Sequence, residues 1–373
     1  MAIGKEISNN RMDNYAVVDL FCGVGGLSHG FFLEKFNVVA GIDNDDTCEY
    51  AFVSNNGGTY FCEDIFKADP IKIKNLFPEG STKILVGCAP CQPFSRYNSF
   101  VKDEDSDDKK WALLLEFAKI IEAVQPDIVS MENVPQLARY NKKGVYSKFI
   151  QILEKNKYFI SDTKQIVYCP DYGVPQNRKR LVLLASKLGP IKLIPPIYNP
   201  KTYPSVKDAI SDLPRLAAGE TDKIDPLHRS QNLSELNLKR IRAAKPGGSW
   251  RDWPLELHLD CHKKLEGRTF GDVYGRMKWT EPSPTLTTHC AAISNGRFGH
   301  PEQDRGISLR EAAILQSFPK EYKFIDPKSK KFSSTSIQRH IGNAVPVKLG
   351  QAIAKSIKVH LDEHINNIKW QEK

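Results

Sequence analysis

The segment GCAPCQPFS, residues 87–95, places two cysteines, Cys88 and Cys91, three positions apart. Cysteines at this spacing occur in zinc sites and in redox pairs, and a single thiolate can also act as a catalytic nucleophile. A zinc site needs four ligands, and the chain has no second pair at matching spacing, since Cys261 and His262 are directly adjacent. The surroundings do not follow the pattern of a thioredoxin-like unit. These residues alone leave Cys91 as a nucleophile, a member of a redox pair or an inert cysteine.

A glycine-rich turn follows the first strand-like segment, in VVDLFCGVGG at residues 17–26. Glycine lets the backbone approach a ligand closely because it has no Cβ. Asp43 ends the next strand-like segment, 20 residues beyond Gly23, which is a spacing typical of a carboxylate that binds a ribose hydroxyl. The dinucleotide fingerprint would have glycine where this chain has Ser28, so the turn favours another adenosine cofactor. Asp64 ends a third segment, where it could bond an adenine amino group. An ordinary tight turn without a ligand is the alternative.

These residues must be positioned by the alternating elements of the first half of the chain. Apolar strand-like segments lie at 15–21, 37–43, 83–88, 127–133, 160–168 and 180–186. Segments with helical spacing of apolar residues lie at 27–36, 46–55, 111–124, 146–156 and 345–365. The charged stretch 102–110 is expected to be a loop. Such alternation predicts an α/β domain with a mostly parallel sheet covered by helices.

The sequence pattern changes near residue 187, where proline becomes frequent and the periodic spacing of apolar residues is lost. The net charge of the chain is +9, and the excess is uneven. Residues 187–280 hold 17 basic and 11 acidic side chains, which is most of the excess. A segment that faces nucleic acid would show such a bias, although a solvated surface would show it too.

Composition excludes several classes of protein. The chain of 373 residues is 40% hydrophobic, which is enough for a large domain and a smaller one. No apolar run approaches the roughly 18 residues of a membrane span, so no membrane association is expected. The N-terminal segment lacks the apolar core of a signal peptide, and the eight cysteines are scattered. We therefore expect a cytoplasmic protein with reduced thiols.

Six short motifs occur in a fixed order: DLFCGVGG, PCQPFS, MENVP, QNRKR, REAAILQSFP and GNAVP. With them the chain resembles the DNA (cytosine-5) methyltransferases of bacterial restriction–modification systems, from about Tyr15 to His360. The resemblance implies a Rossmann-like domain that binds S-adenosylmethionine and a smaller, irregular target-recognition domain, with double-stranded DNA held between them. The expected boundaries are 1–186 for the catalytic domain, 187–330 for the recognition domain and 331–373 for a segment that returns to the first.

The resemblance also implies the catalytic residues. Cys91 would be the thiolate that adds to cytosine C6 and loads electron density onto C5. Glu132, in MENVP, would bond cytosine N3 and the amino group. Arg178 and Arg180 would lie around the flipped base on one face of a strand, with Arg178 on cytosine O2. Arg310 and Glu311, in REAAILQSFP, are expected to form a structural pair.

Cofactor and DNA contacts are carried over in the same way. Several relatives have an aromatic residue after the ribose-binding carboxylate, where this chain has Asn44. Asn343, in GNAVP, is expected to position the loop that holds Pro90 and Cys91. The residues expected on the cofactor side are Phe21, Gly23, Gly25, Asp43, Asp64, Ile65, Pro90 and Asn343. Those expected to contact DNA are Gln92, Ser95, Gln176, Arg240, Arg242, Arg251, Arg276 and Thr287. No metal ion is expected.

The resulting hypothesis is methyl transfer from S-adenosylmethionine to C5 of a flipped cytosine in a specific DNA sequence. The enzyme would act as a monomer and protect host DNA from a cognate restriction endonuclease. A tRNA cytosine-5 methyltransferase shares the same catalytic core and is the main alternative, although the length of the recognition segment favours DNA. A catalytically inactive DNA-binding relative is a third reading, which intact Cys91, Glu132 and Arg178 argue against.

Overall fold

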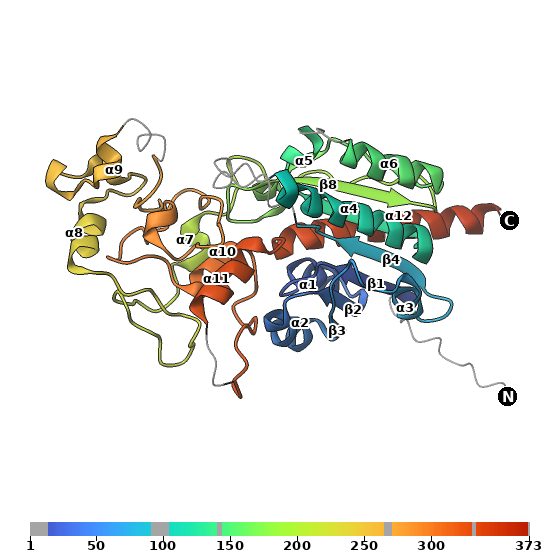
Figure 1. The fold of residues 1–373 in the computed structure, drawn as a ribbon, viewed down its shortest axis with the longest axis horizontal. Helices are drawn as coiled ribbons and strands as arrows, with labels where there is room; N and C mark the ends of the chain where they lie inside the picture. The colour runs from blue at the N-terminus through green and yellow to red at the C-terminus, as the bar shows by residue number, and fades with distance from the viewer. Residues whose placement is uncertain (1–13, 91–103, 140–143, 265–270, 330–332, 372–373) are drawn as a thin grey trace.

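The computed structural model describes residues 14–90, 104–139, 144–264, 271–329 and 333–371. Within them, an eight-stranded sheet forms the centre of the larger part of the molecule (Figure 1). Its strands are β1 (Tyr15–Leu20), β2 (Asn37–Asp43), β3 (Thr59–Cys62), β4 (Thr82–Gly87), β5 (Ile128–Asn133), β6 (Phe159–Ile160), β7 (Ile166–Tyr168) and β8 (Lys179–Ser186).

The strand order is β3-β2-β1-β4-β5-β8-β6, and β7 also pairs with β8. The first five strands are parallel, whereas β8 runs antiparallel to β5, β6 and β7. Parallel pairing requires helical crossovers, which the alternating first half of the chain supplies. The predicted α/β fold with a mostly parallel sheet is confirmed.

Helices cover both faces of this sheet (Figure 1). One face packs on α1 (Gly26–Leu33), α2 (Glu49–Asn56) and α12 (Val347–Gln371). The other packs on α3 (Pro70–Asn75), α4 (Glu104–Val124), α5 (Gln136–Arg139) and α6 (Val145–Lys155). Side chains of a strand alternate between faces, so Ile84 and Val86 belong to the first cluster and Leu85 to the second. No helix among the described residues combines the length and the apolar character needed to cross a membrane.

Two local predictions were wrong. The charged stretch 102–110 was expected to be a loop, yet α4 begins at Glu104. Acidic residues near the start of a helix are favoured by the helix macrodipole, so a run of acidic residues is compatible with a first helical turn. The single strand expected at 160–168 is divided into β6 and β7. Between them Asp162 accepts a hydrogen bond from the backbone of Lys164 at 2.9 Å, which is an Asx turn that interrupts the strand.

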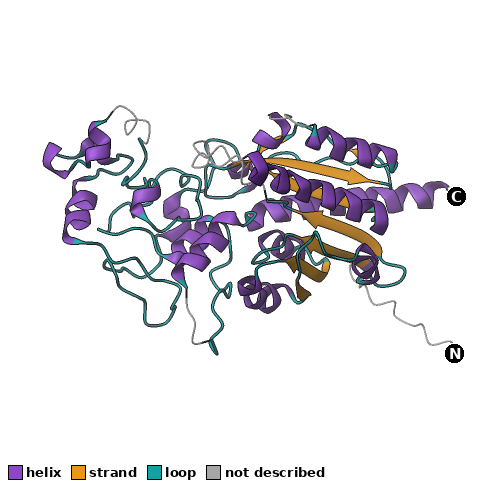
Figure 2. Cartoon of the chain, viewed as in Figure 1, coloured by secondary structure: helices purple, strands orange, loops and turns teal. Residues whose placement is uncertain are grey.

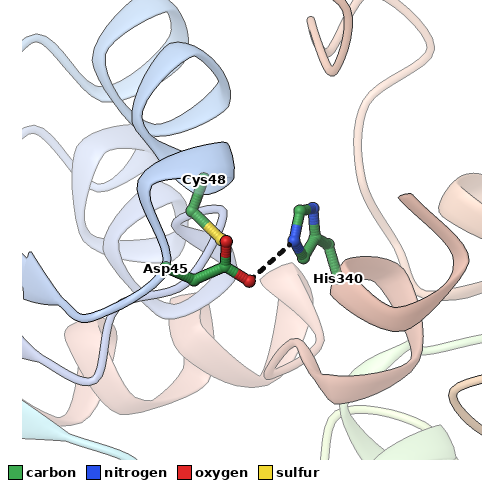
Figure 3. A group of neighbouring side chains, drawn as sticks. All are labelled: Asp45, Cys48 and His340. Carbon is green, nitrogen blue, oxygen red and sulfur yellow. Dashed lines mark hydrogen bonds and ion pairs between the residues drawn. The ribbon is translucent and has the colours of Figure 1, made fainter. Parts of the chain in front are cut away.

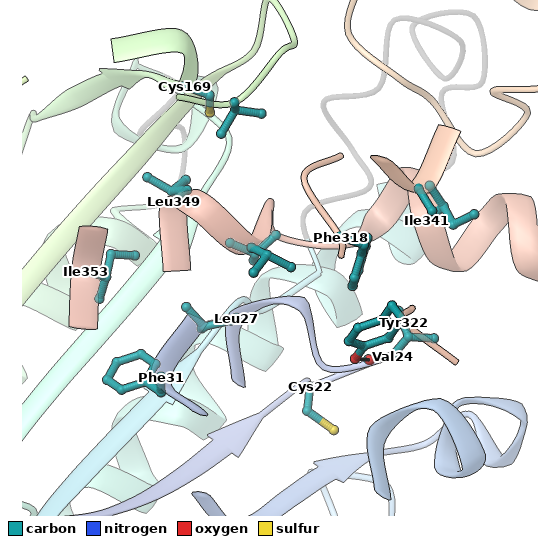
Figure 4. Packing of buried hydrophobic residues seen from close by; sticks show 14 of the residues in the cluster. Cys22, Val24, Leu27, Phe31, Cys169, Phe318, Tyr322, Ile341, Leu349 and Ile353 are labelled. Carbon is teal, nitrogen blue, oxygen red and sulfur yellow. Dashed lines mark hydrogen bonds between the residues drawn. The ribbon is translucent and has the colours of Figure 1, made fainter. Parts of the chain in front are cut away.

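Residues 187–330, predicted above as the recognition domain and called the recognition region below, consist in their described part mostly of loops and short helices (Figure 2). Its α-helices in the described part are α7 (Val206–Ile210), α8 (Glu235–Ala243), α9 (Asp260–Lys263) and α10 (Leu309–Leu315), and α11 (Ser334–Asn343) follows it. Much of its apolar interior is continuous with the α1 and α12 side of the sheet, where Phe318 and Tyr322 lie beside Val24 (Figure 4). The predicted domain boundaries therefore stay a prediction.

Helices α1 and α12 pack closely because two glycines face each other. A Cβ on Gly30 would lie 2.3 Å from the carbonyl carbon of Gly350, and a Cβ on Gly350 would lie 2.9 Å from the carbonyl oxygen of Leu27. Around this point Leu27 and Phe31 of α1 pack near Leu349 and Ile353 of α12 (Figure 4). This contact joins the turn after β1 to the C-terminal helix.

A buried carboxyl group links β1 to α1. The hydroxyl of Ser28 donates to Asp19 Oδ2 at 2.5 Å, and both side chains are fully buried. Asp19 Oδ1 has no hydrogen-bond partner among the described residues. Burial raises the pKa of Asp19 to about 7, and the Ser28 hydroxyl opposes that shift. The position at which a dinucleotide fingerprint would have its third glycine thus carries a side chain with a structural partner.

Replacement of Gly30 by Ala is expected to lower the free energy of unfolding by roughly 1–3 kcal/mol. Alanine is the better helix former, but its Cβ must displace the backbone of α12. Val359, exposed on α12, provides the control, because Val359→Ala removes no buried contact. Equal midpoints of chemical unfolding for the two variants would contradict the close packing.

The pH dependence of stability is expected to contain a contribution from Asp19. Its pKa is raised in the folded state, so the contribution is present at low pH and is lost as the pH rises through about 7. The loss amounts to at most about 4 kcal/mol between pH 4 and pH 8. Asp19→Asn cannot ionise and should show a flatter profile of unfolding free energy over this range. Asp362→Asn, an exposed change on α12, should keep the slope of the parent protein; an unchanged slope in Asp19→Asn would refute the assignment.

Candidate active site

The carboxyl ends of the parallel strands bring together most of the residues predicted from the sequence. Phe21 follows β1, Asp43 ends β2, Asp64 follows β3, and Glu132 lies near the end of β5. Ligands of open α/β sheets bind outside this edge. The first three lie on the half of the edge formed by β1, β2 and β3, and Glu132 lies on the other half.

The turn after β1 is shaped for a close approach. Phe21, Gly23 and Gly25 all have positive φ angles, of 61°, 50° and 83°. The backbone N–H of Gly23 donates to Asp43 Oδ2 at 2.8 Å, and a Cβ on Gly23 would meet no atom within 4 Å. A glycine with open space beside it, next to a half-buried carboxylate, fits a ribose and its neighbouring groups.

Apolar side chains flank this turn on the side of β3. Ile65 is buried, and the Phe21 ring, partly exposed, meets Phe117 edge-on with centroids 6.4 Å apart. The half-buried carboxylate of Asp64 accepts a hydrogen bond from the backbone of Phe66 at 3.1 Å. Apolar side chains and a carboxylate at one end of the sheet are groups that suit an adenine ring, so the residues present fit the adenosyl part of S-adenosylmethionine.

The second half of the edge holds a buried ion pair. Glu132 is 1% exposed, and its Oε1 lies 2.9 Å from Nε of Arg180, the second residue of β8. Its Oε2 accepts a hydrogen bond from the Cys88 thiol at 2.8 Å. Oε1 receives no hydrogen bond with good geometry from the described residues. This carboxylate can therefore still accept a hydrogen bond from a ligand.

The start of the loop with the two cysteines is fixed to the same strand. Asn133 is buried, and its side-chain amide donates to the carbonyl oxygen of Ala89 at 3.0 Å. Pro90 is exposed and is the last described residue before the loop. Cys91, Gln92 and Ser95 lie outside the described residues, so their predicted roles stay predictions.

Arg178 and Gln176 belong to a buried hydrogen-bond network and do not form a surface that could contact DNA in this arrangement. The Arg178 guanidinium donates to the carbonyl oxygens of Leu286 and Gly342, each at 3.2 Å, and to Gln176 at 3.3 Å. Gln176 in turn donates to the side chain of Gln316 at 2.5 Å. Burial, and next the nearby Arg180, lower the pKa of Arg178 to about 9. The side chain predicted to meet cytosine O2 is thus engaged with backbone, and Arg180 is the arginine beside Glu132.

Two other arginines predicted to contact DNA are also internal. Arg276 is 5% exposed and donates to the carbonyl oxygens of Ile241, Ala244, His300 and Gln303 and to the carboxylate of Asp304. Arg240 is 7% exposed; it donates to Leu257 and Asn237 and stacks on Trp253. Both side chains are engaged inside this part of the fold, and their contact with DNA stays a prediction.

The remaining predicted contacts lie nearer the surface. Arg242 is exposed and pairs with Asp304 at 3.1 Å, and Arg251 is exposed with its guanidinium 5.6 Å from the Trp250 ring. Thr287 is half-buried; its carbonyl oxygen would lie 2.1 Å from a Cβ on Gly342. Asn343 is exposed at the end of α11. Arg242 and Arg251 therefore remain candidates for DNA contact.

The expected pair of Arg310 with Glu311 was wrong. Glu311 pairs instead with Arg305, with two contacts of 2.7 Å, and Arg310 pairs with Asp225 at 2.5 Å. Consecutive residues on a helix point in different directions, so neighbours in sequence do not face each other.

A contact between distant segments lies next to Asp43. The side chains of Asp45, Cys48 and His340 have their ligand-type atoms within 4.8 Å of one another (Figure 3). Asp45 is already engaged, since its Oδ2 lies 2.7 Å from Arg339 and 3.2 Å from His340. Three groups also fall short of the four ligands of a structural zinc site. The cluster joins the loop after β2 to α11.

Cys88 and Asn133 contact the site in the structure, although the sequence did not indicate them as parts of it. Alternation along the strands could have found Cys88, because positions 84, 86 and 88 share a face. The register of β4 with β5, in which Gly87 pairs with Met131, then places Cys88 next to Glu132. That register is not visible in the sequence.

The sequence was also compared with known protein families and proteins, and it matches DNA methylases. The sequence model of the family described as C-5 cytosine-specific DNA methylase matches residues 15–359. The chain is 50% identical over 347 residues to the type II methylase M.HgiDII of Herpetosiphon aurantiacus, covering 93% of this chain and 96% of the relative. It is 31% identical to the type II methyltransferase M.Eco47II of Escherichia coli, covering 97% of this chain and 82% of the relative.

A solved structure has the same fold. It is that of a putative DNA modification methyltransferase encoded within an Escherichia coli prophage, with a TM-score of 0.71 at 23% identity, covering 93% of this chain and 99% of that chain. The match of the family sequence model over nearly the whole chain, together with the close relative, shows that the chain belongs to the C-5 cytosine-specific DNA methylase family and is a DNA cytosine-5 methyltransferase.

Proposed function

We propose that this enzyme methylates C5 of a cytosine extruded from double-stranded DNA, through a transient bond between Cys91 and cytosine C6. The observation that carries the proposal is the buried Glu132 carboxylate, which is paired with Arg180 and lies beside the start of the loop with Cys91. A buried carboxylate with remaining acceptor capacity can bind a base edge that offers N–H donors.

S-adenosylmethionine would be held by Phe21, Gly23, Asp43, Asp64 and Ile65, and it supplies an electrophilic methyl group. The protein's own residues raise the nucleophilicity of the base. The Cys91 thiolate adds to C6, while Glu132 stabilises a proton at cytosine N3, so that the electron pair of the C5–C6 bond becomes available at C5. Once C5 carries the methyl group, solvent water takes up the C5 proton, and the electron pair of the C5–H bond re-forms the C5–C6 double bond. The bond between Cys91 and C6 breaks in the same step and regenerates the thiolate.

Within this proposal the two arginines have separate tasks. Arg180 is 13% exposed at its side chain and lies beside Glu132, so we assign to it the contact with cytosine O2. Arg178 keeps the strand that carries Arg180 in place by its hydrogen bonds to Leu286 and Gly342. This reverses the assignment made from the sequence.

The biological role follows from the relatives. Those named above are called type II methylases or methyltransferases, which supports a role in marking host DNA against a cognate restriction endonuclease. The basic bias of residues 187–280 supports duplex DNA as the substrate. Extrusion of the cytosine costs a few kcal/mol, which stacking and hydrogen bonds in the pocket would offset.

Replacement of Cys91 by Ser is expected to reduce methylation by about a thousandfold or more, because a hydroxyl at neutral pH is far less nucleophilic than a thiolate. Transfer of labelled methyl groups to duplex DNA and to tRNA measures the rate and also separates the two substrates. Duplex DNA with 5-fluorocytosine at the target should form a denaturation-resistant adduct with the parent enzyme only.

Cys261→Ser is the matched control, because Cys261 is exposed on α9. It should keep full activity and adduct formation. Full activity of Cys91→Ser, or methylation of tRNA in preference to DNA, would refute the proposed function.

The assignment of the arginines predicts two different phenotypes. Arg180→Lys should lower the single-turnover rate by roughly tenfold to a hundredfold with little loss of stability, since a lysine retains charge but loses the planar donor geometry. Arg178→Lys should instead lower the thermal unfolding midpoint, because it leaves buried carbonyl groups unpaired at about 1–3 kcal/mol each. Thermal unfolding and single-turnover assays of both variants test this, and exchanged phenotypes would restore the assignment made from the sequence.

A further inference from the structure

Cys88 lies on the same face of the sheet as the ion pair of the proposed pocket. It follows β4 directly, in line with Ile84 and Val86, whose side chains face α1 and α12. Glu132 of β5 and Arg180 of β8 belong to that face too, together with Ile128 and Val182 respectively. The position of Cys88 is thus fixed by strand register and not by the loop that follows.

The Cys88 thiol is the donor in its hydrogen bond with Glu132. It donates to Oε2 at 2.8 Å. Burial, and next the Glu132 charge, raise the pKa of Cys88 well above its usual value, so the group stays a donor throughout the neutral range. The thiol is therefore suited to holding the carboxylate and not to acting as a second nucleophile.

Arg180 and Cys88 hold opposite ends of the carboxylate. Arg180 Nε lies 2.9 Å from Oε1, and the Cys88 sulfur lies 2.8 Å from Oε2. With both oxygens engaged, rotation of the carboxylate about its last side-chain bond would break one contact. Each oxygen of an ionised carboxylate has two acceptor sites, so the base can bind without displacing either partner.

We propose that Cys88 is a positioning residue for Glu132: its thiol fixes the plane of the carboxylate in the orientation that meets the N3 and amino edge of cytosine. The proposal rests on the role of Glu132 in the proposed function. It assigns no covalent or redox step to Cys88.

The test compares the parent cysteine with three substitutions at position 88, so that the effect of the hydrogen bond can be separated from the effect of packing. Cys88→Ser keeps a donor, Cys88→Val has no donor and a side chain larger by about one methyl group, and Cys88→Ala has neither a donor nor the volume. A positioning role predicts that Cys88→Val and Cys88→Ala both lower the single-turnover methylation rate by about threefold to tenfold. The rate of Cys88→Ser should stay within about twofold of that of the parent enzyme. The KM for DNA should change little, since the base is positioned for reaction rather than bound more weakly.

The pH profile gives a second readout. A hydrogen-bond donor at position 88 favours the ionised form of the carboxylate. Loss of the donor in Cys88→Val and Cys88→Ala should therefore displace the acid side of the pH–rate profile to higher pH. Cys88→Ser should show the profile of the parent enzyme. Cys169→Ala is the matched control: Cys169 is a buried cysteine in the same apolar cluster, and its loss should leave the pH profile unchanged.

Several outcomes would overturn the inference. The first is a methylation rate like that of the parent enzyme in both Cys88→Val and Cys88→Ala. The second is a rate that depends on side-chain volume, with Cys88→Val active and both Cys88→Ser and Cys88→Ala impaired. Glu132→Gln distinguishes these from failure of the proposed function: if that variant remains fully active, the function itself is wrong, whereas an inactive Glu132→Gln with silent changes at Cys88 removes only this inference.

Discussion

The site depends on a carboxylate that the fold removes almost completely from water. Burying an ionised group is costly unless it is paired and hydrogen-bonded, and Glu132 has a partner of each kind. The cation comes from the second residue of β8, and it can reach the carboxyl edge only because β8 runs antiparallel to β5. In an all-parallel sheet the start of a strand of eight residues such as β8 would lie at the opposite edge, roughly 25 Å away.

The same stretch of chain ties the pocket to the recognition region. Two residues before Arg180, the Arg178 guanidinium binds carbonyl oxygens from the segments around Leu286 and Gly342, and Gln176 binds Gln316. These groups are buried, so moving the recognition region against β8 would leave charged and polar atoms without partners. The geometry of the proposed base pocket and the placement of the recognition region are therefore coupled by hydrogen bonds and not only by apolar packing.

The sequence predicted the strands that end at the site because a buried strand has a strong apolar pattern and parallel strands share one edge. It placed Phe21, Asp43, Asp64 and Glu132 at that edge for this reason. It failed for the arginines, because nothing in the sequence shows whether a guanidinium finds carbonyl acceptors inside the fold. Arg276 and Arg178 occur in segments as basic as those of Arg242 and Arg251, yet the first two are buried and the other two are exposed. Register between distant strands, which places Cys88 beside Glu132, is likewise a tertiary property.

Two buried carboxyl groups on one face of the sheet show how the fold distributes charge. Asp19 in β1 accepts hydrogen bonds from Ser28 and has no cation in contact among the described residues, so burial favours its neutral form. Glu132 in β5, two strands away in the order β1-β4-β5, has both a guanidinium and a thiol as partners. The two carboxyl groups therefore differ in whether the fold supplies a cation. In the proposed reaction positive charge develops at cytosine N3, and the carboxyl group with the guanidinium and the thiol is the one that would lie beside the reacting base.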